Sequence, residues 1–186
     1  MKWCGRASFR PSSSILPENA CMVETLPAER MVLKQLPCPL IQCDAWEGAL
    51  AAFEPALARE IGGPLPTQVG EIAGRDGLRV VRAGPRRFWV FPAERASAIA
   101  SGIPPELGCR LDLSEGRIRI EVTSPDLRDL VSKCLAIDWE RTLGVATFSS
   151  LHRIPVMFTR SSERDGAFVV PRSFARSISE WLEGCQ

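Results

Sequence analysis

The 186-residue chain contains no tyrosine and a single histidine, His152. Both side chains are common general acids and bases, so their scarcity narrows the acid–base chemistry open to the chain. A metal site built from several histidines is excluded, because the chain has only one imidazole. The seven cysteines are scattered and form no C-x-x-C pair, which predicts reduced, unlinked thiols and no bound metal.

An excess of charge of one sign is also missing, and so are long apolar runs. The 23 basic and 22 acidic side chains leave a net charge of +1, so no overall field attracts nucleic acid or an anionic membrane. No stretch approaches the roughly 18 apolar residues of a membrane-spanning helix, and no apolar signal core follows Met1. We therefore expect a cytoplasmic protein with neither nucleic acid nor a membrane as its partner.

What the chain does contain is 45% apolar residues, enough to bury a sizeable core. Residues 1–21 are rich in serine and arginine and have no acid before Glu18, which predicts a disordered tail. A transit peptide, or a coding start placed upstream of Met22 or Met31, are the alternatives for this segment. Residues 22–186 are expected to form one folded domain.

Residue spacing predicts α+β architecture, with mostly antiparallel sheets and packed helices. Prolines between residues 22 and 43 favour extended chain with short strands. The elements expected after them are a helix over 44–61 interrupted by Pro55, a hairpin over 78–91, a helix over 92–102, a second hairpin over 109–122, a helix over 124–134, two strands within 144–160, a strand over 166–170 and a final helix from Pro171.

Three local patterns have both a chemical and a structural interpretation. His152, beside Arg153 in a strand-like stretch, could act as a base, but an edge-strand or interface position is favoured because no G-x-S-x-G nucleophile motif is present. Asp138 and Glu140 flank Trp139, and a solvated loop with a buried tryptophan is favoured over acid–base work. The glycines at 62, 63, 70 and 74 match no nucleotide-binding loop and indicate a connector.

The segment "FVVPRSFARSISEWL", residues 168–182, indicates the start of the last helix. Its apolar residues recur at helical spacing and predict a buried stripe made of Phe174, Ile178, Trp181 and Leu182. Arg172 and Arg176 lie four apart and could form one basic face for a partner's carboxylates. Trp89, in the strand-like "RRFWVF", is expected in a core strand, with contact to a ligand or partner as the alternative.

These stretches together resemble the gamma subunit of heterotetrameric sarcosine oxidase. The resemblance covers roughly two thirds of the chain, and the N-terminal third departs from it. It is carried by "LPTQVG", "AGPRRFWVF", "LDLSEGRIRIEVTSPDLRDLVSKCLAIDW", "GVATFSSLHRIPVMFTR" and, most specifically, "FVVPRSFARSISEWL". It implies a fold like the folate-binding domain of the glycine-cleavage aminomethyltransferase.

The resemblance further implies an accessory, non-catalytic subunit that binds no cofactor itself. Alpha, beta and delta subunits would hold FAD, FMN, NAD and tetrahydrofolate and carry out the oxidative demethylation of sarcosine. The expected partner interface consists of Arg172, Ser173, Arg176 and Trp89. Alternatives are a stand-alone folate-binding regulator, a subunit of a related N-methyl amino acid dehydrogenase and, more weakly, a small hydrolase using Ser173 or a cysteine with His152.

Overall fold

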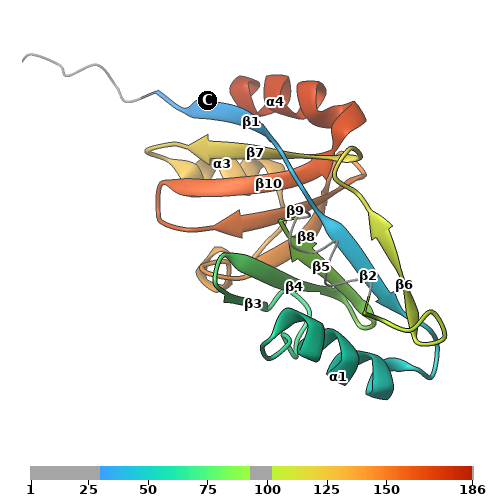
Figure 1. Ribbon diagram of the computed structural model, residues 1–186. Coiled ribbons are helices and arrows are strands. Elements are labelled where there is room, and N and C mark those ends of the chain that lie inside the picture. Colours follow the sequence, from blue (N-terminus) through green and yellow to red (C-terminus); the bar gives the residue numbers. More distant parts are fainter. Residues whose placement is uncertain (1–29, 93–101, 186) are drawn as a thin grey trace, which may run out of the picture.

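The computed structural model describes residues 30–92 and 102–185 (Figure 1). The predicted tail over 1–21 and most of the helix predicted over 92–102 lie outside these residues. The described part folds into two five-stranded antiparallel sheets with helices, which confirms the α+β prediction.

The first sheet has the strand order β1-β7-β10-β9-β8, and the second has the order β3-β4-β5-β2-β6. The strands of the first sheet are β1 (Val32–Pro37), β7 (Arg117–Thr123), β8 (Ala146–Leu151), β9 (Ile154–Arg160) and β10 (Asp165–Pro171). Those of the second are β2 (Ile41–Ala45), β3 (Ile72–Arg75), β4 (Leu78–Gly84), β5 (Arg87–Phe91) and β6 (Gly108–Asp112).

Helices cover one face of each sheet, and the other two faces meet in the middle of the molecule. Helix α1 (Leu50–Ile61) packs on the second sheet. Helices α3 (Leu127–Cys134) and α4 (Ala175–Gly184) pack on the first, together with the 3-10 turn η1 (Trp139–Arg141). Figure 1 shows α1 and α4 at opposite ends, which gives four layers in the order helix, sheet, sheet, helix.

Strand alternation explains why both faces of each sheet are apolar. In β4, Val80 belongs to the core under α1, whereas its neighbour Val81 belongs to the core between the sheets. In β10, Phe168 packs under the first sheet's helices and Val169 points to the second sheet. Successive strand residues point to opposite faces, so a strand covered on both sides needs apolar residues at every position.

The predicted second hairpin is wrong, because its two arms lie in different sheets. β6 pairs with β2 in the second sheet, and β7 pairs with β1 and β10 in the first. The chain passes between the sheets twice, at Cys38–Leu40 and at Leu113–Gly116, and the passages are bonded to each other. Leu113 N–H donates to the Leu40 carbonyl at 2.9 Å, and Leu40 N–H donates to Ser114 Oγ at 3.1 Å.

The first predicted helix begins later than expected. Residues Asp44 and Ala45 belong to β2, which pairs with both β5 and β6, so α1 starts only at Leu50 and then runs through Pro55 without a break. Trp46 therefore lies outside the helix, exposed, and its indole N–H donates to the Pro105 carbonyl at 2.7 Å. The 78–91 hairpin is confirmed as β4 and β5.

Candidate functional site

Three of the four residues of the predicted partner interface lie where β10 passes into α4, and Trp89 lies apart from them between the sheets. Arg172 and Ser173 belong to the 3-10 turn η2 (Arg172–Phe174), Arg176 belongs to the first turn of α4, and all three are exposed. The 3-10 turn has about three residues per turn, so it changes the phase of the helical pattern. Phe174 is consequently 43% exposed, contrary to the predicted stripe. The buried residues of α4 are Ala175, Ile178, Ser179 and Leu182.

Each arginine of this surface already has a carboxylate nearby. Arg172 Nε donates to the Glu115 carbonyl at 2.6 Å, and its Nη2 lies 3.3 Å from Glu115 Oε2. Arg176 Nε donates to Glu180 Oε1 at 2.7 Å, a bond that raises the pKa of Arg176. Arg172 therefore links the second passage between the sheets, which contains Glu115, to the turn that precedes α4. Arg176 is the more open of the two, with 90% of its side chain exposed.

Trp89 lies between the two sheets and is 7% exposed. Its ring meets Phe148 of the first sheet edge-on at 5.4 Å between centroids, and its Nε1 donates to Gln42 Oε1 at 3.0 Å. The Arg117 guanidinium lies 5.6 Å from the same ring. The core position favoured by the sequence is confirmed, while contact with a partner stays a prediction for all four residues of the expected interface.

His152 lies in a turn rather than in a strand. His152 and Arg153 have φ of +47° and +67° and form the two-residue connection between β8 and β9. Two successive positive φ values are typical of the type I′ hairpin turn. The imidazole packs against Trp181 of α4, with 3.3 Å between ring centroids. His152 therefore joins a hairpin tip to the last helix.

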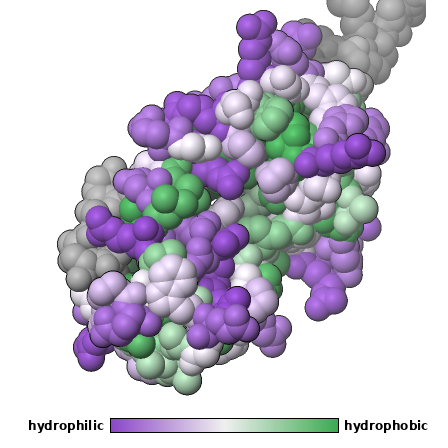
Figure 2. Space-filling model, turned by 90° about the vertical axis from the view of Figure 1, so that its right-hand side faces the viewer, coloured by the Kyte–Doolittle hydropathy of each residue, from purple (hydrophilic) through white to green (hydrophobic). Residues whose placement is uncertain are grey.

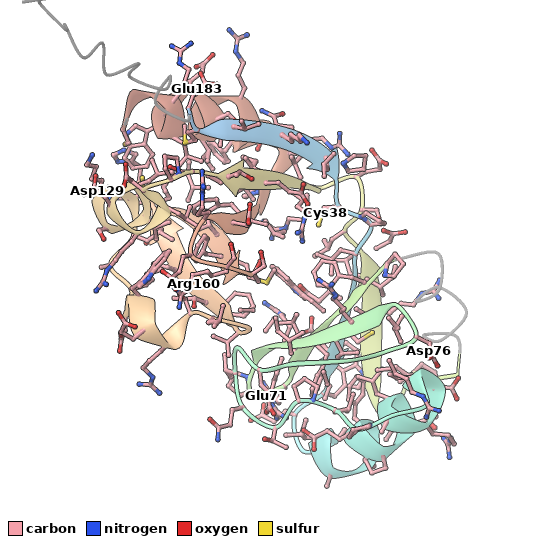
Figure 3. The ribbon with its side chains drawn as sticks, turned by 90° about the vertical axis from the view of Figure 1, so that its left-hand side faces the viewer. Cys38, Glu71, Asp76, Asp129, Arg160 and Glu183 are labelled. Carbon is pink, nitrogen blue, oxygen red and sulfur yellow. The ribbon has the colours of Figure 1, made fainter. Side chains whose placement is uncertain are left out.

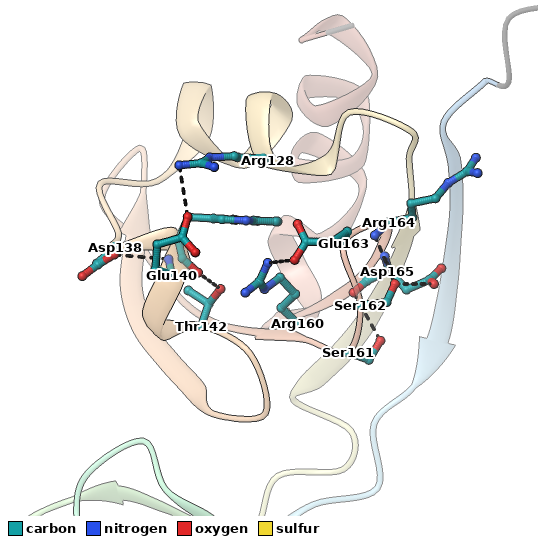
Figure 4. A network of polar contacts seen from close by, with 11 residues as sticks. Arg128, Asp138, Glu140, Thr142, Arg160, Ser161, Ser162, Glu163, Arg164 and Asp165 are labelled. Atoms are coloured by element: carbon teal, nitrogen blue, oxygen red, sulfur yellow. Dashed lines mark hydrogen bonds and ion pairs between the residues drawn. The ribbon is translucent and has the colours of Figure 1, made fainter.

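Asp138 and Glu140 serve local structure, as the sequence favoured (Figure 4). Asp138 Oδ1 accepts the Glu140 N–H at 3.2 Å, which caps η1, and Glu140 pairs with Arg128 at 3.2 Å. Trp139 between them is buried, and the Arg160 guanidinium lies 4.2 Å from its ring. Arg160 also pairs with a carboxylate, at 2.7 Å from Glu163 Oε1.

The glycine-rich connector is also structural. Gly62 ends α1 in a left-handed conformation with φ of +72°.

Within residues 30–92 and 102–185, no group of three or more histidine, cysteine, aspartate or glutamate side chains could hold a metal ion. No helix among these residues is long and apolar enough to span a membrane.

Figure 2 shows one face of the molecule, on which hydrophilic side chains surround apolar patches that gather about the hollow between its two halves. The large exposed apolar residues are Val32 and Leu36, both of β1, and, from other parts of the described chain, Trp46, Val69, Leu111, Leu143 and Phe174. Phe174 is the one that stands beside the arginines of the predicted interface.

Curated relatives of the chain carry one name. It is 34% identical over 135 residues to the sarcosine oxidase subunit gamma of Corynebacterium sp. strain P-1, covering 68% of this chain and 66% of the relative. It is 34% identical over 140 residues to the subunit of the same name from Arthrobacter sp., covering 71% and 68%. The chain thus spans about two thirds of the length of these relatives. No family model matches it.

Two solved structures have a similar fold. A chain of the heterotetrameric sarcosine oxidase from Corynebacterium sp. U-96, solved in complex with pyrrole 2-carboxylate, matches with a TM-score of 0.73 and 26% identity over 83% of both chains. The glycine cleavage system aminomethyltransferase T from Bartonella henselae matches with a TM-score of 0.58 and 16% identity. That match covers 84% of this chain and 46% of the transferase, and it shows the fold alone.

Proposed function

Because the chain belongs to the family of sarcosine oxidase gamma subunits, we propose that it is an accessory subunit of a heterotetrameric sarcosine oxidase complex. Its partners in this proposal are alpha, beta and delta subunits in the cytoplasm. Those subunits hold FAD, FMN, NAD and tetrahydrofolate and demethylate sarcosine, and this chain contributes structure rather than chemistry. The alternative is that the chain has the same accessory role in a related complex that acts on another N-methyl amino acid.

The main support is the match to a chain of a heterotetramer over 83% of both chains. A fold kept over that length includes nearly all the elements that could present a surface to other subunits. In this chain the surface we assign to assembly is formed by Arg172, Ser173 and Arg176 with the exposed Phe174 beside them. Arginine and aromatic side chains are enriched in protein interfaces. Trp89, which is 7% exposed, would contribute little to this surface.

Co-expression with the candidate alpha, beta and delta subunits tests the assembly. The tagged chain is expected to co-purify with a yellow flavoprotein that oxidises sarcosine. Arg176→Glu should lower the co-purified fraction, because it puts a negative charge where the proposed partner surface is acidic. Arg59→Glu on α1 is the matched control, since Arg59 is also an exposed helix arginine beside a glutamate but lies at the opposite end of the molecule.

Two results would contradict the proposal. A chain that stays monomeric and never co-elutes with flavin absorbance removes the subunit role altogether. Equal losses from Arg176→Glu and Arg59→Glu leave the role standing but remove the assignment of the α4 surface. Turnover of sarcosine against other N-methyl amino acids by the assembled complex then identifies the substrate.

A further inference from the structure

A cleft opens between the inner faces of the two sheets, and part of its wall is formed by residues of the core that joins them. It has a volume of about 290 Å³. The second sheet contributes Val81 and Phe91 to its wall, and the first sheet contributes Met157 and Val169. Figure 3 shows the two sheets from the side, with Arg160 in one half and Glu71 in the other. A cleft with apolar walls between layers is a common form of small-molecule site.

The charged side chains of this cleft are all basic. Arg79 of β4 and Arg119 of β7 both line it, one from each sheet, and no carboxylate does. Strand register places them within the apolar rows, since Arg79 is opposite Phe91 and Arg119 is opposite Val169. Each arginine therefore stands directly beside an apolar wall residue.

Both guanidinium groups have donors to spare. Arg79 forms no ion pair with any of the described residues. Arg119 uses Nε for Glu121 Oε1 at 3.1 Å, and a guanidinium has five N–H donors in all. Arg160 also borders the cleft, but its guanidinium lies over Trp139, which belongs to the core under the helices. The positive charge available in the cleft therefore comes from Arg79 and Arg119.

We propose that this cleft binds a small organic anion, with a carboxylate held by Arg79 and Arg119 and an apolar body packed on Val81, Met157 and Val169. Arginine binds carboxylates through two parallel N–H···O bonds, which fixes the anion's orientation as well as attracting it. The volume is near the lower end for ligand sites, so the ligand is the size of a single substituted ring. The site adds a ligand to a chain to which the proposed function assigns none.

Titration of the purified full-length chain with benzoate and with benzamide tests the site. The two compounds have nearly the same shape and differ in charge. Benzoate should bind about tenfold more tightly, since a charge-assisted hydrogen bond is worth more than a neutral one. Arg79→Gln and Arg119→Gln should each weaken benzoate about tenfold and leave benzamide unchanged. Arg176→Gln is the control, because it removes the same charge from an exposed arginine on α4, away from the cleft.

Lysine variants distinguish a loss of binding from misfolding of the glutamine variants. Arg79→Lys and Arg119→Lys keep the charge and lose the planar fork, so they should bind benzoate between the wild type and the glutamine variants. The proposal is overturned if benzoate and benzamide bind equally, if Arg176→Gln weakens benzoate as much as the cleft variants do, or if neither compound gives a saturable signal at about 10 mM. The isolated chain is used, so this outcome does not depend on assembly with other subunits.

Discussion

At the scale of single residues, Gly70 stands where the two halves of the molecule touch. Its φ is +90°, and a Cβ built on it would lie 2.6 Å from the Ala146 carbonyl oxygen. Its N–H donates to the Arg82 carbonyl at 2.9 Å, and its own carbonyl accepts the Ala146 N–H at 2.7 Å. One glycine thus links β4 of the second sheet to β8 of the first.

Gly70→Ala is expected to lower the free energy of unfolding by about 3 kcal/mol. About 1–2 kcal/mol comes from a side chain at positive φ and the rest from contact with the Ala146 carbonyl. Gly48→Ala is the control, because Gly48 has φ of +79° with nothing within 4 Å of its added Cβ. Urea unfolding of both variants checks this, and equal losses would mean that the close approach to β8 contributes nothing.

Two buried thiols make the free energy of unfolding depend on pH in the alkaline range. Burial raises the pKa of Cys43 to about 12 and that of Cys38 to about 11, from a reference of 9.0. Between pH 9 and these values the unfolded chain has lost protons that the folded chain keeps, so the free energy of unfolding falls as pH rises. We expect no such effect below pH 9, where both states are protonated.

Denaturant titrations at a series of pH values measure this slope. Cys43→Ala should make it shallower above pH 9, because the variant lacks this titrating thiol. The thiol reagent DTNB at pH 8 should also modify Cys109 faster than Cys43, because Cys109 is less buried and the raised pKa of Cys43 keeps it from forming the reactive thiolate. Rapid labelling of Cys43 in the folded chain would contradict the predicted burial effect.

At the scale of elements, the two passages between sheets form one junction. β1 continues into β2, and β6 continues into β7. These two segments run antiparallel to each other through both sheets (Figure 1). Ser114 closes the middle of this ribbon, because its Oγ accepts the Leu40 N–H and its N–H donates to Asp112 Oδ1 at 2.9 Å. Hydrogen bonds from the Ser114 side chain and from its backbone N–H lower the pKa of Asp112.

Ser114→Ala should cost about 1–2 kcal/mol, because it leaves the buried Leu40 N–H without its partner. Ser132→Ala on the exposed side of α3 is the control and should change stability by less than about 0.5 kcal/mol. Hydrogen exchange at the Leu40 amide gives a direct measurement. An unchanged protection factor in Ser114→Ala would show that the junction does not rely on this hydroxyl.

The sequence predicted most elements but not how they are shared between sheets. The valine- and aromatic-rich stretches on both sides of Gly84-Pro85 predicted β4 and β5 correctly, since those strands do pair with each other. Apolar–polar alternation on both sides of Ser114 predicted a hairpin where none exists, because a local pattern is identical whether a strand pairs with its neighbour or with a distant one. The prediction that Phe174 is buried was wrong for a related reason. One 3-10 turn shifted the helical phase at a position that residue spacing could not reveal.

At the scale of the whole molecule, the two sheets are held together by a shared core. Trp89, Val81, Met157 and Val169 form it with neighbours from both sheets, and Trp89 is its largest side chain. Each sheet also has its own helix-covered core, so either half could retain structure without the other. The contacts of this shared core therefore couple the unfolding of the two halves.

Trp89→Leu is expected to destabilise the chain by about 3 kcal/mol, within the range for large-to-small core substitutions. Unfolding should remain a single transition, because the same core and the β1–β2 ribbon join both halves. Trp46→Leu is the control and should cost less than about 1 kcal/mol at its exposed position. Two separate transitions for wild type, seen by circular dichroism and by tryptophan fluorescence, would contradict a cooperative unit.

The sequence by itself determined the kinds of element, the apolar faces of the strands and the family resemblance, because these depend on residues near one another along the chain. Only the tertiary structure decided that β6 and β7 belong to different sheets and that Arg172 contacts Glu115. It also decided that Arg79 and Arg119 face one cleft from opposite sides. Those residues are far apart along the chain, and their neighbourhood depends on how the two sheets pack, which no local spacing encodes.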